Sequence, residues 1–104
     1  MSYIVPAGTR IGHVHLKVTN LERSLGFYRD LLGFEVQQLF GDSAAFISAG
    51  GYHHHIGLNT WHSRGSGPPP KSATGLYHVA IRFPSRKDLA TTVKRVLEAG
   101  VQLQ

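Results

Sequence analysis

Two histidines occupy matching positions in a repeated segment, and imidazole chemistry is the first that this chain suggests. Residues 12–18 (GHVHLKV) and 77–83 (YHVAIRF) are similar, and they carry His13 and His78 in equivalent places. Histidine is the commonest metal ligand, and its unperturbed pKa lies near neutrality. If the two copies pack face to face, both imidazoles can reach one cavity and bind a metal ion there.

A second group of histidines lies in residues 50–61, which read GGYHHHIGLNTW. Alternation along a strand over 53–60 places four residues on one face: His53, His55, Gly57 and Asn59. We expect His53 and His55 to line a substrate cavity, where an imidazole can donate to a substrate oxygen or act as acid or base. His54 faces the other way in this interpretation and bonds a neighbouring strand or loop.

The elements that position these residues form a β-α-β-β-β unit. Residues 11–18 alternate as a strand, with His13 and His15 on the face opposite Val14. A helix follows, for which Thr19 and Glu22 form a capping-box pattern and Asn20 is an alternative cap. After the stop at Gly33 the pattern changes to three strands, at 34–40, 44–49 and 53–60.

A second unit begins in the same way but ends early. The glycines and three consecutive prolines of 62–75 predict a surface linker. A strand at 76–83 and a helix starting at Ser85 follow, and we expect the apolar stripe of that helix to be buried: Leu89, Val93, Val96 and Leu97. Only four residues remain after Gly100. We therefore expect a fragment of a longer protein, or strands supplied by a second chain through exchange.

The carboxylates do not complete a metal site with the two histidines. Two histidines and one carboxylate are typical of non-haem Fe(II) oxygenases. The chain has six acidic residues: Glu22, Asp30, Glu35, Asp42, Asp88 and Glu98. None is expected late on an inward-facing strand opposite the histidine pair. The sequence thus predicts that the third, acidic ligand is not present in this chain.

Composition narrows the choice of partners. The chain has 104 residues, which suffices for one domain, and no cysteine, which excludes disulfides and thiolate metal sites. The net charge of +5 comes mostly from scattered residues, without interleaved aromatic residues, so nucleic-acid binding is not predicted. No apolar stretch approaches the roughly 18 residues of a membrane helix. A cytoplasmic protein without membrane contact is the expectation.

The run over residues 11–36 resembles the opening module of the vicinal oxygen chelate superfamily, which includes glyoxalase I, bleomycin resistance proteins and extradiol dioxygenases. Residues 24–28 and 32–34 carry its helix signature, and residues 50–61 look like the catechol 2,3-dioxygenase-like branch. The resemblance spans almost all of 9–104. It implies an α+β fold of paired βαβββ modules within one domain, with the first module at 9–61, a linker at 62–75 and an incomplete second module at 76–104.

The resemblance also implies a function, that of a metal-dependent extradiol dioxygenase domain or fragment. His13 and His78 match the first-strand metal ligands of the two modules, and Fe(II) is the expected ion, with Mn(II) as the alternative. A catecholic substrate and O₂ would be the partners. The remaining assignments are His53 and His55 as catalytic groups and a substrate pocket of His15, Asn59 and Trp61. A glutamate of glyoxalase-type members would fall near Gly57, which argues against glyoxalase I chemistry.

A different function is a metal-free binding module. Bleomycin resistance proteins sequester small molecules as dimers, and Phe46, Tyr52 and Trp61 could line such a pocket. A homodimer, possibly strand-exchanged, is expected for either function. Bound iron or manganese would favour the enzyme, whereas a metal-free protein that binds aromatic molecules would favour the binding module.

Overall fold

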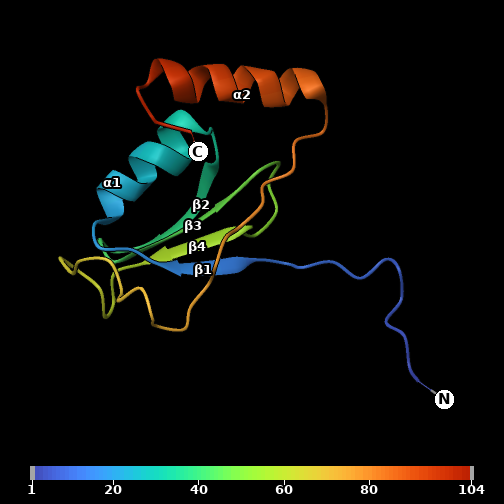
Figure 1. Ribbon diagram of the computed structural model, residues 1–104, viewed down its shortest axis with the longest axis horizontal. Helices are drawn as coiled ribbons and strands as arrows, with labels where there is room; N and C mark the ends of the chain where they lie inside the picture. The colour runs from blue at the N-terminus through green and yellow to red at the C-terminus, as the bar shows by residue number, and fades with distance from the viewer. Residues whose placement is uncertain (1, 104) are drawn as a thin grey trace.

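A four-stranded mixed sheet organises the first part of the chain, and one helical segment covers one of its faces (Figure 1). The computed structural model describes residues 2–103. In chain order the elements are β1 (Val14–Lys17), α1 (Leu21–Leu25), the π-helix η1 (Gly26–Leu31), β2 (Glu35–Phe40), β3 (Ala44–Ser48), β4 (Ile56–Asn59) and α2 (Arg86–Glu98). The strand order is β1-β4-β3-β2, with β1 parallel to β4 and the other pairs antiparallel. The predicted β-α-β-β-β order of the first unit is confirmed.

Glycines with positive φ lie in both connections between the antiparallel strands. Gly41 between β2 and β3 has φ of 56°, and Gly50 and Gly51 between β3 and β4 have φ of 75° and 83°. Side chains disfavour these backbone angles, so glycine is required there. The last strand begins at Ile56, later than the predicted residue 53. The histidine triplet therefore lies in the loop before β4.

The first helix is capped by Asn20, the second of the two predicted candidates. Its side-chain oxygen accepts a hydrogen bond from the Arg23 backbone N–H at 3.0 Å. Thr19 instead accepts one from the Arg23 guanidinium at 2.7 Å. The helix continues as η1, in which the Leu32 N–H donates to the Phe27 carbonyl, and Gly33 ends it with φ of 91°. In this π-helical turn each hydrogen bond spans five residues, one more than in an α-helix, so the side chains after it are shifted by one position.

The core lies between the helical segment and one face of the sheet. Its fully buried members are Leu21, Leu25, Ala45, Ile47, Ile56 and Leu58. Val14 and Leu16 of β1 pack against this cluster, whereas His15 and Lys17 point away from it. The two faces predicted for the first strand are therefore confirmed.

The strand predicted at 76–83 does not form. These residues have no strand pairing and most are exposed, although the preceding linker is anchored to the end of β1 by a hydrogen bond from Ser63 Oγ to the Val18 carbonyl at 2.7 Å. In the first unit, β1 pairs with the last strand of its own unit. Among residues 2–103, nothing after α2 offers the corresponding partner, so the backbone of 76–83 has no ladder to join.

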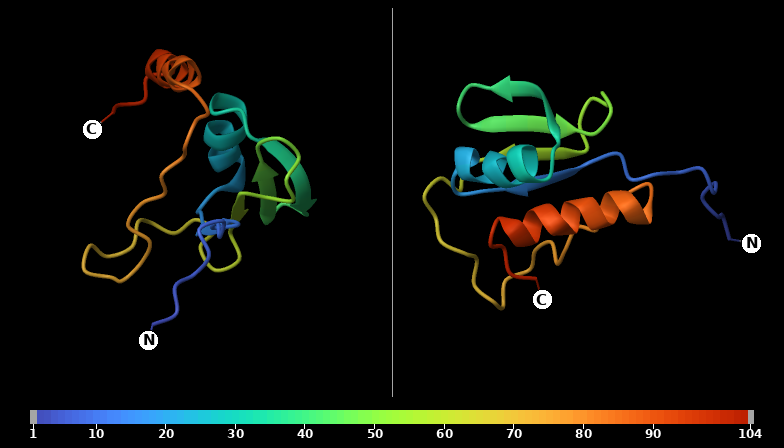
Figure 2. Two further views of the ribbon diagram at one scale, coloured as in Figure 1. Left: turned by 90° about the vertical axis from the view of Figure 1, so that its right-hand side faces the viewer. Right: turned by 90° about the horizontal axis from the view of Figure 1, so that it is seen from above.

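The second helix starts as predicted but covers no sheet. The Ser85 hydroxyl caps it by accepting from the Asp88 N–H at 3.1 Å. Of its predicted buried stripe, Val96 is buried, whereas Leu89 and Leu97 are 47% and 54% exposed, which corrects the prediction. Because α2 lies beside α1 and η1 and does not cover the sheet, only part of its apolar stripe is buried (Figures 1 and 2). None of the helices in the described part of the chain is long and apolar enough to cross a membrane.

Candidate functional site

The sheet face opposite α1 carries most of the predicted pocket residues, and we call it the open face. His15 on β1 lies directly across from Gly57 on β4, and Phe46 on β3 flanks the same glycine from the other side. Asn59 is two residues further along β4 and therefore shares this face. The alternation of side chains along paired strands brings these residues together, and His15 and Asn59 are two of the three residues that the sequence analysis assigned to a substrate pocket.

Gly57 makes room for the ring of His15. A Cβ atom built at position 57 would lie 2.6 Å from His15 Nδ1, closer than any side chain tolerates. The glycine thus lets the imidazole lie flat across β4. The sequence analysis noted only that Gly57 cannot supply a ligand, and it missed this close approach.

A hydrogen-bond chain fixes the protonation of His15. The Trp61 backbone N–H donates to Asn59 Oδ1 at 3.0 Å, which orients the amide and turns its NH₂ group toward His15 Nε2. The Nε2 atom must then accept, so the imidazole is neutral with its proton on Nδ1. Burial, followed by the nearby charges of His13 and Lys17, lowers the pKa of His15 and favours the same neutral form.

Aromatic rings extend the open face on both sides of His15. The Trp61 ring centroid lies 5.8 Å from that of His15, and Phe40 packs edge-on against Trp61 at 6.4 Å. The indole N–H donates to Ser43 Oγ at 3.1 Å, which holds a side chain that is 50% exposed. On the other side Phe46 is 6.1 Å from His15. The face therefore offers stacking surface to a planar molecule.

The histidine triplet does not alternate as predicted, because it precedes β4. His54, which the sequence analysis set aside, packs on the open face with its ring centroid 4.3 Å from His13 and 5.1 Å from Phe46. Tyr52 stacks on both His53 and His55, at 4.0 and 4.5 Å. The weak signal in the sequence was that the three histidines are not among the residues of high β propensity, whereas Ile56 is.

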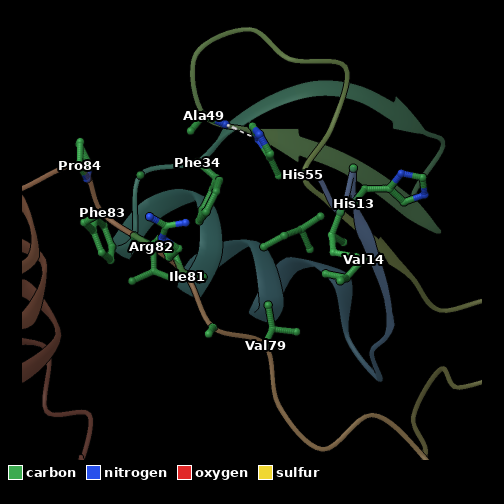
Figure 3. A pocket seen from close by; sticks show the side chains of 16 residues that line it. His13, Val14, Phe34, Ala49, His55, Val79, Ile81, Arg82, Phe83 and Pro84 are labelled. Atoms are coloured by element: carbon green, nitrogen blue, oxygen red, sulfur yellow. Dashed lines mark hydrogen bonds between the residues drawn. The ribbon is translucent and has the colours of Figure 1, made fainter. Parts of the chain in front are cut away.

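A cavity of about 390 Å³ opens beside the start of β1 (Figure 3). Its walls come from segments 11–14, 32–34, 55–56 and 79–84, with Ala49. Most lining side chains are apolar; His13, His55 and Arg82 are the polar ones. His55 Nδ1 accepts a hydrogen bond from the Ala49 N–H at 3.2 Å. The neutral ring then carries its proton on Nε2, where it is a donor.

His78 is not on the wall of this cavity, although the residues that follow it are. Its ring contacts that of its neighbour Tyr77, at 5.0 Å. The predicted approach of His13 and His78 depends on a strand at 76–83, and that strand is missing. Within residues 2–103, no group of three or more histidine, aspartate or glutamate side chains is arranged to hold a metal ion. The residues present therefore do not fit a complete metal site, and we derive no catalytic step through one.

The lowered pKa values of His15 and His54 predict how the free energy of unfolding depends on pH. Burial, then the charges of His13, His53, His15 and His55, lowers the pKa of His54, and the pKa of His15 is lowered as well. Below about pH 6.5 the unfolded chain takes up these protons more readily than the folded one. The free energy of unfolding should therefore be highest above pH 6.5. It should decrease as the pH falls from 6.5 through the two lowered pKa values.

Urea unfolding between pH 5 and 8, with a chelator present, measures this dependence. The double variant His15→Gln, His54→Gln should flatten the slope below pH 6.5. An unchanged slope would assign the dependence to other groups. Asp30, whose pKa is lowered by its hydrogen bond to Arg29, titrates at lower pH and does not interfere.

Comparison with known proteins gives consistent matches. Residues 10–104 match the model of the Glyoxalase/Bleomycin resistance protein/Dioxygenase superfamily. The chain is 44% identical over 101 residues, 96% of its length, to Catechol-2,3-dioxygenase of Bacillus subtilis, and it covers 35% of that protein. It is 31% identical over 100 residues, 89% of this chain and 33% of the relative, to the Iron-dependent extradiol dioxygenase of Rhodococcus jostii. The chain thus spans about a third of the length of these relatives.

Solved structures agree on the fold. A possible glyoxalase from Bacillus cereus superposes with a TM-score of 0.67 at 18% identity, over 93% of this chain and 80% of that one. Lactoylglutathione lyase from Agrobacterium tumefaciens gives 0.68 at 15% identity, over 95% and 76%. These two likenesses concern the fold alone. The match of the family model over residues 10–104 shows that the chain belongs to the Glyoxalase/Bleomycin resistance protein/Dioxygenase superfamily.

Proposed function

We propose that this chain is part of an extradiol, ring-cleaving dioxygenase that acts on a catechol-type substrate with O₂. The observation that carries the proposal is the 44% identity, over almost the full chain, to a protein named as a catechol dioxygenase. Two more distant relatives are named Manganese-dependent 2,3-dihydroxybiphenyl 1,2-dioxygenase and Iron-dependent extradiol dioxygenase. Gly57 is consistent with this class, because it leaves no ligating side chain at the position of the glyoxalase glutamate.

In this function the open face receives the aromatic ring, and the cavity at the start of β1 lies beside it, with His13 on the cavity wall. Trp61 and Phe46 supply the flat surfaces, and His15 is held neutral between them. Of the two histidines assigned to catalysis, His55 lines the cavity and carries its proton on Nε2, where it can donate to a substrate oxygen. His53 instead contacts His54 through Nδ1. We therefore assign the acid or base role to His55.

The metal assignment is the second part of the proposal. His13 and His78 would hold Fe(II) or Mn(II) together with an acidic ligand from outside this chain. This arrangement requires residues 76–83 to form the strand that is absent here, so that His78 turns toward His13. The proposal therefore names the residues that would hold the ion and specifies no coordination geometry.

Metal content and ligand binding test the two parts separately. The longer protein proposed above, in which the acidic ligand accompanies this chain, is loaded with Fe(II) or Mn(II) under anaerobic conditions, and bound metal is counted for the parent, His13→Ala and His78→Ala. We expect retention near one ion per site in the parent and loss in both variants. Retention by both variants would remove this histidine pair from consideration.

Fluorescence of Trp61, the single tryptophan, reports catechol binding. We expect quenching by catechol, and weaker binding in His55→Ala, because the Nε2 donor is lost. His62→Ala, in an exposed residue outside both sites, is the matched control. Equal affinity in the parent and His55→Ala would contradict the role of His55.

The second candidate is a metal-free module that binds aromatic molecules. It is favoured by the row of rings on the open face, formed by Phe40, Trp61, His15 and Phe46. Absence of iron and manganese from the longer protein after loading, together with quenching of Trp61 by catechol, would support it over the enzyme. Sedimentation of the same sample tests the expected homodimer.

A further inference from the structure

Two neighbouring imidazoles in the loop before β4 converge on each other. His53 Nδ1 and His54 Nδ1 are 3.0 Å apart. In a strand, successive side chains point to opposite faces, and the sequence analysis placed His54 on the face opposite His53 on that ground. Because β4 begins only at Ile56, the restriction does not apply, and the two nitrogens can share one ion.

Both rings are held in place by packing. The His54 ring lies against His13 at 4.3 Å and against Phe46 at 5.1 Å. The His53 ring stacks on Tyr52 at 4.0 Å. A donor pair fixed in this way loses little side-chain freedom when it binds a ligand.

The distance between the nitrogens indicates the kind of ion. With metal–nitrogen bonds of about 2.05 Å, a separation of 3.0 Å corresponds to an angle of about 94° at the metal. A tetrahedral site would need a separation of about 3.3 Å with the same bonds. Right angles between nitrogen donors are typical of the square or tetragonal sites of Cu(II) and Ni(II).

We propose that His53 and His54 form a binding site for Cu(II) or Ni(II), in which the two Nδ1 atoms occupy neighbouring positions and water fills the others. The ion would replace the single proton that the two nitrogens otherwise share. The site uses neither His78 nor an acidic ligand, so it is distinct from the iron or manganese site proposed above. Its success or failure leaves that proposal unaffected.

Titration of the purified chain with CuCl₂ at pH 7 tests the site by calorimetry and by electron paramagnetic resonance. The parent should bind one Cu(II) with hyperfine coupling to two imidazole nitrogens. His53→Ala and His54→Ala should each weaken binding at least about tenfold, since each removes one of two protein donors. His53 is exposed, so its variant tests the site without disturbing the fold. Circular dichroism verifies folding of both variants.

His62→Ala is the matched control, because it removes an exposed histidine outside the pair. It should bind Cu(II) as the parent does. The proposal is overturned if His53→Ala retains the affinity of the parent, or if His62→Ala loses as much affinity as His53→Ala. It is also overturned if the parent binds no Cu(II), in which case the 3.0 Å contact is an ordinary hydrogen bond between two imidazoles.

Discussion

Replacing Leu25 by alanine is expected to lower the free energy of unfolding by roughly 2–5 kcal/mol, the range for truncating a fully buried leucine. Leu25 is 1% exposed, and it packs from α1 onto the sheet among Ile47, Ile56 and Leu58. The substitution removes buried apolar surface and leaves a cavity that rigid neighbours fill only in part. Urea unfolding followed by circular dichroism measures the change.

Whether the variant stays folded depends on the total stability of the chain, which is limited by its small core. Six residues form the buried cluster, and α2 adds little to it because most of its apolar stripe is exposed. A core of this size supports only a few kcal/mol of net stability, about 3–5 kcal/mol in small domains. We therefore expect Leu25→Ala to be largely unfolded at 37 °C.

Leu39→Ala is the matched control for this prediction. Leu39 on β2 is 55% exposed, and its truncation should change stability by less than about 0.5 kcal/mol. A comparable loss in both variants would mean that the packing of α1 on the sheet is not what holds the first unit together.

Replacing Gly57 by alanine is expected to displace the His15 ring and to weaken any ligand binding on the open face. The added Cβ would lie 2.6 Å from His15 Nδ1 and 2.9 Å from its Cε1, so the ring must rotate away. Rotation breaks the hydrogen bond to Asn59, whose amide is left without this partner. We expect a loss of roughly 1–3 kcal/mol in stability, as for overpacking and an unpaired polar group.

Nuclear magnetic resonance of the His15 ring identifies the cause. In Gly57→Ala the ring signals should shift and the pKa of His15 should rise toward its ordinary value, because burial lowers that pKa in the parent. Catechol quenching of Trp61 should weaken in the same variant, since His15 packs beside the indole. Unchanged ring signals would contradict the close approach of His15 to Gly57.

Gly26→Ala is the control that separates crowding from the general effect of replacing glycine. Gly26 has helical angles, with φ of −56°, and a Cβ there would meet nothing within 4 Å. Alanine should stabilise this position by about 0.4–1 kcal/mol, because it restricts the unfolded chain. The two substitutions therefore have opposite expected signs.

Local patterns in the sequence were sufficient for much of the first unit. Apolar alternation defined the two faces of β1, and the caps Asn20 and Ser85 marked the helix starts because each accepts a backbone hydrogen bond three residues later. The glycines between strands marked the turns, since only glycine adopts their backbone angles freely. The family followed from the same segments and is confirmed over residues 10–104.

Tertiary structure decided which histidines meet. A strand exists only where its backbone finds a partner, and the partner is set by the whole sheet. For this reason β4 starts at Ile56 and not at residue 53, His54 rather than His53 reaches the open face, and residues 76–83 remain without a ladder. The sequence by itself determined the types of residue available for chemistry, whereas pairing between distant segments determined which of them lie together.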